Sequence, residues 1–149
     1  MSPEGHSVRI VVIVLVRRGH RYLMVRDDKR GGTWYPPAGI LQRGEDVTAA
    51  ANRVVQRASG CTPLLEGIVR ISHMPLLPGN ELGRLRFVLE AHLSTEALSE
   101  TTAKAPASYL LPSEIRGLEL RDDSVASLIA EHARGMPTTS LDVYRLGLV

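Results

Sequence analysis

The first third of the chain combines short apolar runs with polar turns, a pattern typical of β-strands. Residues 8–16, VRIVVIVLV, are rich in Val and Ile and too few to span a bilayer, so they predict a buried strand. A turn at residues 17–19 leads into RYLMVRD at residues 21–27, which predicts a hairpin. The segment TWYPPAG at residues 33–39 must be extended, because its two adjacent prolines exclude a helix.

From Val47 onward the apolar residues recur at helical rather than strand spacing. Gly60 follows this stretch in the position of a C-terminal cap. The pattern therefore predicts a helix that Gly60 terminates. Its predicted buried face consists of Val47, Ala50, Ala51, Val54, Val55 and Ala58.

The middle of the chain returns to strand patterns. LLEGIVRISHM at residues 64–74 and GRLRFVLEAHL at residues 83–93 predict two strands joined by a loop. The second strand alternates apolar and polar residues, so one of its faces should contact solvent. Residues 94–106 are polar and predict a loop, and ASYLL at residues 107–111 predicts a short strand.

The last third predicts helices packed against this sheet. Pro112 begins a turn or short helix, and residues 122–134 predict a helix capped by Asp122 or Asp123. The order of strands, helix, strands and helix predicts an α/β fold, with a mixed β-sheet sandwiched between α-helices. The 149 residues suit a single domain 1–149, with a core at about 8–134 and no assignment for the tail 136–149.

Composition narrows the classes of function. Eighteen basic and sixteen acidic residues give a net charge of +2, which suits a phosphate-bearing small molecule better than extensive duplex nucleic acid. Cys61 is the only cysteine, so an internal disulfide is impossible and secretion has no support. We therefore expect a cytoplasmic protein with no membrane partner. The five histidines lack metal-ligand spacing, which argues against a zinc site.

One segment carries a specific motif. GTWYPPAGILQRGE, followed by a helix that contains an arginine and ends in glycine, resembles the Nudix hydrolase family (MutT-like). The family's box reads G-x5-E-x7-R-E-U-x-E-E-x-G-U, where U is aliphatic. Matching residues stand at five positions without a gap, and the resemblance extends from about residue 8 to residue 134. The five are Gly39, Glu45, Arg53, Val55 and Gly60.

The departures from the box concern its chemistry. In the family, three glutamates on one helical face hold Mg²⁺ against a diphosphate. This chain has Val54, Arg57 and Ala58 at those positions, and none of them is a hard oxygen ligand. The resemblance therefore implies a degenerate box with no metal at the usual site, and with Mg-dependent pyrophosphatase catalysis lost or strongly reduced.

A rearranged magnesium site would need another set of carboxylates, and this alternative stays open. It would make the protein an active Nudix hydrolase with unusual metal placement. The candidate acids are Glu45, Asp46, Glu66, Glu81, Glu90 and Glu100.

The remaining box residues have mainly structural interpretations. The resemblance implies that Glu45 and Arg53 form a salt bridge that holds the loop to the helix. Gly39 and Gly60 should serve a tight turn and a helix stop. A catalytic role for Glu45 or Arg53 is the alternative.

Four residues are candidates for binding a nucleotide or another diphosphate-containing ligand. Arg57 would project into the cleft and could replace the metal's charge, unless it is a solvated surface arginine. Arg26 lies where family members contact a ligand phosphate, although it could be a simple strand-end charge. Arg86 is on the polar side of its strand. Trp34 could stack on a base or pack in the core.

These observations leave three hypotheses for function. The first is a protein that keeps ligand binding without the usual catalysis. The second is a hydrolase with a rearranged metal site. The third is a non-catalytic platform for a protein or RNA partner, and a homodimer through exposed sheet edges is also possible.

Overall fold

The computed structural model describes residues 7–75, 79, 82–93 and 107–144. The predicted loop at 94–106 lies outside these residues. The described residues form strands, three α-helices and two short 3-10 turns. The strands are β1 (Val8–Arg18), β2 (Arg21–Asp27), β3 (Thr33–Tyr35), β4 (Ala38–Ile40), β5 (Leu64–Met74), β6 (Gly83–His92) and β7 (Ala107–Leu110). The helices are α1 (Val47–Ser59), α2 (Pro112–Arg116) and α3 (Ser124–Ala133), and the turns are η1 (Asp28–Arg30) and η3 (Leu141–Val143).

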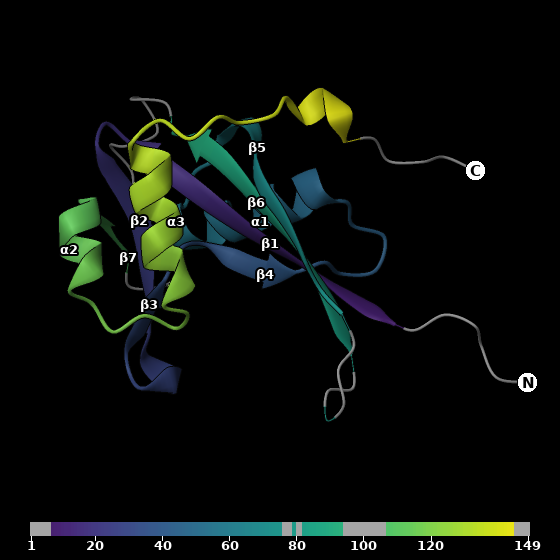
Figure 1. The fold of residues 1–149 in the computed structure, drawn as a ribbon, viewed down its shortest axis with the longest axis horizontal. Helices are drawn as coiled ribbons and strands as arrows, with labels where there is room; N and C mark the ends of the chain where they lie inside the picture. Colours follow the sequence, from purple (N-terminus) through teal and green to yellow (C-terminus); the bar gives the residue numbers. More distant parts are fainter. Residues whose placement is uncertain (1–6, 76–78, 80–81, 94–106, 145–149) are drawn as a thin grey trace, which may run out of the picture.

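The strands form one mixed sheet in the order β3-β2-β1-β6-β5. Strand β1 pairs in parallel with β6 along most of its length, from Val8 opposite Gly83 to Arg17 opposite His92. It pairs antiparallel with β4 in its middle, and with β2 only at the hairpin turn. Strand β7 pairs with β2. Strand β1 is therefore central, and β4 lies beside it where β2 has separated from it (Figure 1).

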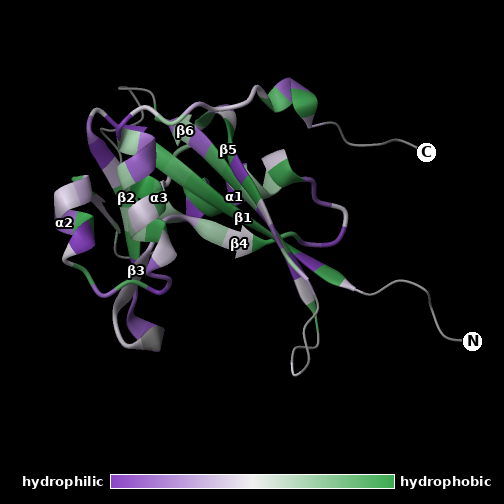
Figure 2. Ribbon diagram, viewed as in Figure 1, coloured by the Kyte–Doolittle hydropathy of each residue, from purple (hydrophilic) through white to green (hydrophobic). Residues whose placement is uncertain are grey.

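Helix α1 covers one face of the sheet, and α2 and α3 cover the other (Figure 1). Val12 and Val14 belong to the apolar cluster under α1, whereas Ile13 and Leu15 belong to the cluster under α3. Burial on both faces explains why the central strand is continuously apolar rather than alternating (Figure 2). The predicted fold class, a mixed sheet between helices, is confirmed.

Strand β6 differs from the prediction that one of its faces contacts solvent. Val88 is fully buried in the cluster under α3, so that face is covered in its second half. Only the first half of the face is open, where Arg84 is exposed and Arg86 is partly buried. The prediction is wrong for Val88, because alternation along a strand does not reveal where a distant helix will pack.

The predicted helix ends are largely confirmed. The Asp46 carboxylate accepts a hydrogen bond from Ala49 N at 2.7 Å and caps α1. Gly60 ends α1 in the left-handed conformation, with φ of 77°, as a C-terminal cap requires. At α3 the side chain of Asp122 accepts from Ser124 N at 3.0 Å, whereas Asp123 makes no such bond.

The tail, for which the sequence predicts nothing, is fixed to the sheet. Ile68 N donates to Thr139 O at 2.7 Å, and Thr139 N donates back to Ile68 O at 2.9 Å. Gly67 allows this approach, because a Cβ atom there would lie 2.9 Å from Thr139 O. Farther along, the Tyr144 hydroxyl accepts from Val47 N at 3.1 Å, so the tail also reaches the first turn of α1.

A chain of hydrogen bonds crosses the core beneath α3. The Tyr22 hydroxyl bonds His132 Nδ1 at 2.7 Å, and His132 Nε2 bonds the Glu90 carboxylate at 2.5 Å. Burial raises the pKa of Tyr22 above its ordinary value. His132 thus joins β2, β6 and α3 as a buried structural residue. In the described part of the chain, no helix has the length and apolar character needed to cross a membrane.

Candidate functional site

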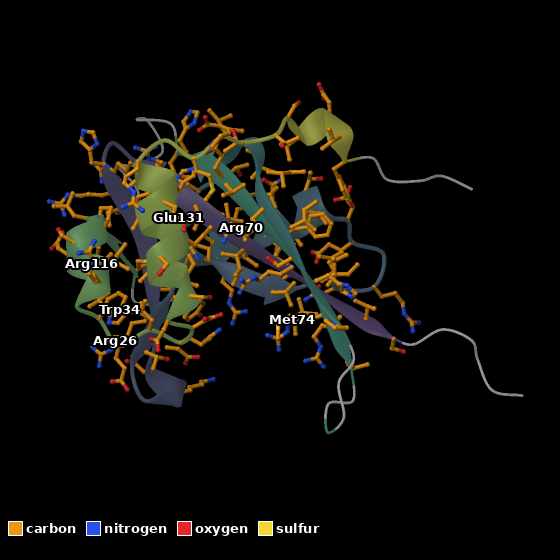
Figure 3. All side chains as sticks on the ribbon, viewed as in Figure 1. Arg26, Trp34, Arg70, Met74, Arg116 and Glu131 are labelled. Atoms are coloured by element: carbon orange, nitrogen blue, oxygen red, sulfur yellow. The ribbon has the colours of Figure 1, made fainter. Side chains whose placement is uncertain are left out.

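A large open cleft of about 1380 Å³ lies where β4, the start of β6 and α1 meet. The β2–η1 segment and the start of α3 complete its walls. All four predicted ligand-binding residues, Arg26, Trp34, Arg57 and Arg86, line this one cleft. Arg26 and Trp34 are directly paired across β2 and β3 and lie close together in Figure 3. The structure therefore brings together residues that the sequence separates widely.

The α1 wall of the cleft carries the three altered box positions. Val54 and Ala58 are each 4% exposed and belong to the apolar cluster under the helix, whereas Arg57 is exposed. Two hydrocarbon side chains and a guanidinium supply no oxygen atom to a cation. Mg²⁺ binds through carboxylates, water and substrate phosphates, so the residues present at this wall do not fit it.

Of the six alternative carboxylates proposed from the sequence, the structure describes four, and none of these four lines the cleft. Glu45 is bonded to Arg53, Asp46 caps α1, and Glu66 pairs with His92. Glu90 is engaged with the buried His132. Each of these four acids is directed into a structural contact, and Glu45 lies beside the cleft through its bond to Arg53, which lines it. Glu81 and Glu100 lie outside the described residues.

Four aspartates that sequence reasoning did not propose as metal ligands do line the cleft. Three of them are paired with arginines: Asp27 with Arg121 at 2.6 Å, Asp28 with Arg26 at 2.9 Å, and Asp122 with Arg86 at 3.2 Å. A hydrogen bond from Ser124 holds the pKa of Asp122 below its ordinary value, and Arg86 adds to this effect. In the described part of the chain, no three His, Cys, Asp or Glu side chains are grouped to hold a metal. The fourth aspartate is Asp123.

The predicted Glu45–Arg53 salt bridge is present and bidentate. Arg53 Nε and Nη2 donate to the two carboxylate oxygens of Glu45 at 2.8 and 2.9 Å. Arg53 Nη2 also donates to Ile40 O at 3.0 Å, and Gln42 N donates to Glu45 at 3.1 Å. Side-chain hydrogen bonds from Arg53 are the main cause of a lowered pKa at Glu45. The pair joins β4, the loop after it and α1.

Gly39 is needed for close packing rather than for a turn. It lies inside β4 and has no positive φ, so the predicted tight turn at this residue is wrong. A Cβ atom on Gly39 would lie 2.8 Å from the Val54 Cγ1 atom, which is too close for any real contact. The absent side chain lets α1 approach the strand that forms the floor of the cleft.

Positive charge exceeds negative charge in the cleft. Eight basic and four acidic side chains line it. Arg9, Arg57 and Arg84 are exposed and make no ion pair with another described residue. Guanidinium groups without a carboxylate partner remain available to bind phosphate oxygens. The described side chains that line the cleft therefore carry a net positive charge.

Sequence reasoning missed a stacked pair at one side of the cleft. The Arg121 guanidinium lies 3.6 Å from the centre of the Tyr35 ring, and both residues line the cleft. Arg121 reaches this position because its backbone N donates to Trp34 O at 3.0 Å, extending the edge of β3. Neither residue lies in a pattern that would reveal this contact, since the two elements are distant in the sequence.

Comparison with solved structures identifies the fold. A NUDIX hydrolase from Nitrosomonas europaea is 23% identical, with a TM-score of 0.78 over 95% of this chain and 98% of that one. The E. coli dihydroneopterin triphosphate pyrophosphohydrolase is 17% identical, with a TM-score of 0.61 over 85% and 94% of the two chains. A UDP-X diphosphatase is 14% identical, with a TM-score of 0.68 over 93% and 68%.

No protein-family model matches the sequence, and a search of curated proteins found no match. The structural agreement extends over nearly the whole chain and includes proteins described as Nudix hydrolases. The protein therefore has the Nudix fold.

Proposed function

We propose that the protein binds a nucleotide or a related diphosphate-containing molecule, with arginines in place of Mg²⁺, and has little or no catalysis of the usual Nudix type. The observation that carries this proposal is the α1 wall of the cleft. It presents Arg57 between two buried apolar residues where the resembling box has three metal-binding glutamates. This wall thus carries a positive charge, which suits a phosphate, in place of the negative charges that would hold a metal ion.

A guanidinium can perform one part of the role that a metal ion has beside a diphosphate. It supplies permanent positive charge and two parallel N–H donors that match phosphate oxygens. It does not lower the pKa of a bound water molecule, which is how a metal generates a nucleophile at neutral pH. The substitution therefore favours binding and disfavours hydrolysis.

The structural neighbours favour a ligand with linked phosphates, but they do not favour a particular nucleobase or other organic group. One is described as acting on UDP-X compounds and another on dihydroneopterin triphosphate, so their organic groups differ while both contain linked phosphates. In this chain Trp34, Tyr35 and the stacked Arg121 offer flat surfaces in the same cleft. We infer that these residues contact the organic part of the ligand.

An active hydrolase with a rearranged metal site is the second candidate, and the four cleft aspartates are the observation that favours it. Three of these carboxylates already have arginine partners, so a metal would have to displace those pairs. The arginine-based binding site is therefore the better-supported function. A platform for a protein or RNA partner stays a prediction.

The role of Arg57 can be tested by calorimetric titration of the protein with NAD⁺ in the presence of EDTA. We expect Arg57→Gln to weaken binding by about 10-fold or more, the effect of losing a charge-assisted hydrogen bond. Arg116→Gln is the matched control, because Arg116 is an exposed arginine on α2 that does not line the cleft (Figure 3). Equal affinities for the wild type and Arg57→Gln would show that this guanidinium does not bind the ligand.

A further inference from the structure

The cleft contains a second group of arginines, on a different wall from Arg57. Parallel pairing of β1 and β6 places Arg9 directly opposite Arg84, and Val11 opposite Arg86. Adjacent strands lie about 4.8 Å apart, and residues two apart on a strand share a face. Arg9, Arg84 and Arg86, called here the β1–β6 arginine cluster, are therefore neighbours on the open face of the sheet.

The described residues neutralise this cluster only in part. Arg86 pairs with Asp122 at 3.2 Å, whereas Arg9 and Arg84 have no ion pair with another described residue. The neighbour of Arg84 on its other side is Met74 of β5, which is 54% exposed and uncharged (Figure 3). Like charges directly opposite each other across two strands destabilise a sheet. A bound anion would remove this repulsion.

The two positive regions of the cleft lie on opposite sides of β4. Arg57 is on α1, which packs on one face of the sheet and touches Gly39 through Val54. The arginine cluster is on the other face, which α3 covers farther along β6. Ile40 of β4 is paired with Val11, directly beside the cluster. A ligand that contacts both regions must extend around this short strand.

We infer that the ligand carries two separate anionic groups: a diphosphate bound near Arg57 and a phosphate monoester bound by the β1–β6 arginine cluster. This inference rests on the proposed function and narrows it to one chemical class. Bidentate bonds from Arg84 and Arg9 to the monoester oxygens would neutralise the cluster, and the organic part of the ligand would join the two phosphate sites. Trp34 and Tyr35, which lie on β3 and line the same cleft, are the aromatic residues available to contact that part.

Two pairs of molecules differ only in such a monoester: NADP⁺ with NAD⁺, and coenzyme A with dephospho-coenzyme A. We expect the wild type, titrated calorimetrically in EDTA, to bind the more phosphorylated member of at least one pair about 10-fold more tightly. In Arg84→Gln and in Arg9→Gln this ratio should fall below about 3-fold. In Arg57→Gln both members should weaken while the ratio persists, and Arg116→Gln should change neither quantity.

The outcomes separate this inference from the proposed function. Equal binding of both members of each pair by the wild type would overturn the second phosphate site and leave the diphosphate site standing. A preference that survives both Arg84→Gln and Arg9→Gln would also overturn the assignment to the cluster. Failure of all four molecules to bind would overturn the proposed function, and this inference with it.

Discussion

At the scale of single residues, position 57 changes what the α1 wall of the cleft can bind. A glutamate there would contribute an oxygen ligand to a cation, whereas Arg57 contributes a cation itself. Val54 and Ala58 cannot compensate, because both are buried hydrocarbon side chains. One arginine between two apolar residues thus gives this wall a positive charge and no oxygen ligand, which is the basis of the proposed anion site.

Glu45 joins the loop after β4 to α1 through Arg53, and this contact yields a testable pH dependence. Its pKa is held below the ordinary value of 4.5 by Arg53. The carboxylate therefore stabilises the folded state fully above the unfolded-state pKa, and this stabilisation is lost as the pH falls through the lowered pKa. We expect Glu45→Gln to reduce the free energy of unfolding by roughly 1–3 kcal/mol at neutral pH. It should also make stability less sensitive to acid.

Urea unfolding of both proteins from neutral pH down to about pH 3, below the ordinary pKa of a glutamate, measures this difference. Glu131→Gln is the control, because Glu131 pairs with Arg70 on the surface and its loss should cost less than about 1 kcal/mol. If both substitutions change the free energy of unfolding equally at every pH, Glu45 has no structural role beyond that of an ordinary surface carboxylate.

The sequence could predict a site residue only where that residue lies in or beside a recognisable motif, or on a strand with a clear alternation of apolar and polar positions. Arg57 follows from its place in the box, and Arg26 and Trp34 from their places before it. Arg9 and Arg84 carry no local signal, since only the register between β1 and β6 makes them neighbours. The four cleft aspartates were missed for the same reason: their shared position depends on how distant elements meet.

At the scale of elements, α1 is a well-formed helix whose residues 54, 57 and 58 depart from the box that the segment resembles. Its cap, its C-terminal glycine and its contact with β4 are all satisfied by the residues present. Local patterns predicted this helix and the main strands because their apolar residues recur with a clear period. The tail was not predictable, since the contacts that hold it, the backbone pairing of Thr139 with Ile68 and the bond from Val47 N to Tyr144, join it to distant elements.

Placing glutamates at positions 54, 57 and 58 of α1 tests whether these three side chains alone prevent the helix from binding a metal ion. We expect the triple variant Val54→Glu, Arg57→Glu and Ala58→Glu to unfold at a lower temperature without metal, because two of the new charges replace buried apolar groups. Mg²⁺ should raise the melting temperature of the variant and leave that of the wild type unchanged. The variant should also gain metal-dependent hydrolysis of NAD⁺.

Calorimetric scans with and without Mg²⁺, followed by an assay for released mononucleotide, measure both effects. A folded triple variant that binds Mg²⁺ but hydrolyses none of the diphosphates tested would show that the cleft is not shaped for such substrates. The diphosphate assignment would then fail even though the metal site had been rebuilt.

At the scale of the whole molecule, helices on both faces enclose a mixed sheet (Figure 1). The large cleft is lined by residues of the sheet, α1 and the start of α3. The class of fold was predictable because the order of strands and helices restricts how layers can pack. The charge of the cleft was not, because it depends on arginines contributed by β1, β2, β6, α1 and the segment before α3. The molecule combines the Nudix fold with a cleft in which basic side chains outnumber acidic ones.

The most direct measurement is a calorimetric titration of the wild-type protein with NADP⁺, performed once in EDTA and once in Mg²⁺, with product analysis after each. Arginines that act in place of the metal predict binding of equal affinity in the two conditions and an intact ligand at the end. Binding that requires Mg²⁺, or cleavage that EDTA abolishes, would contradict the central claim.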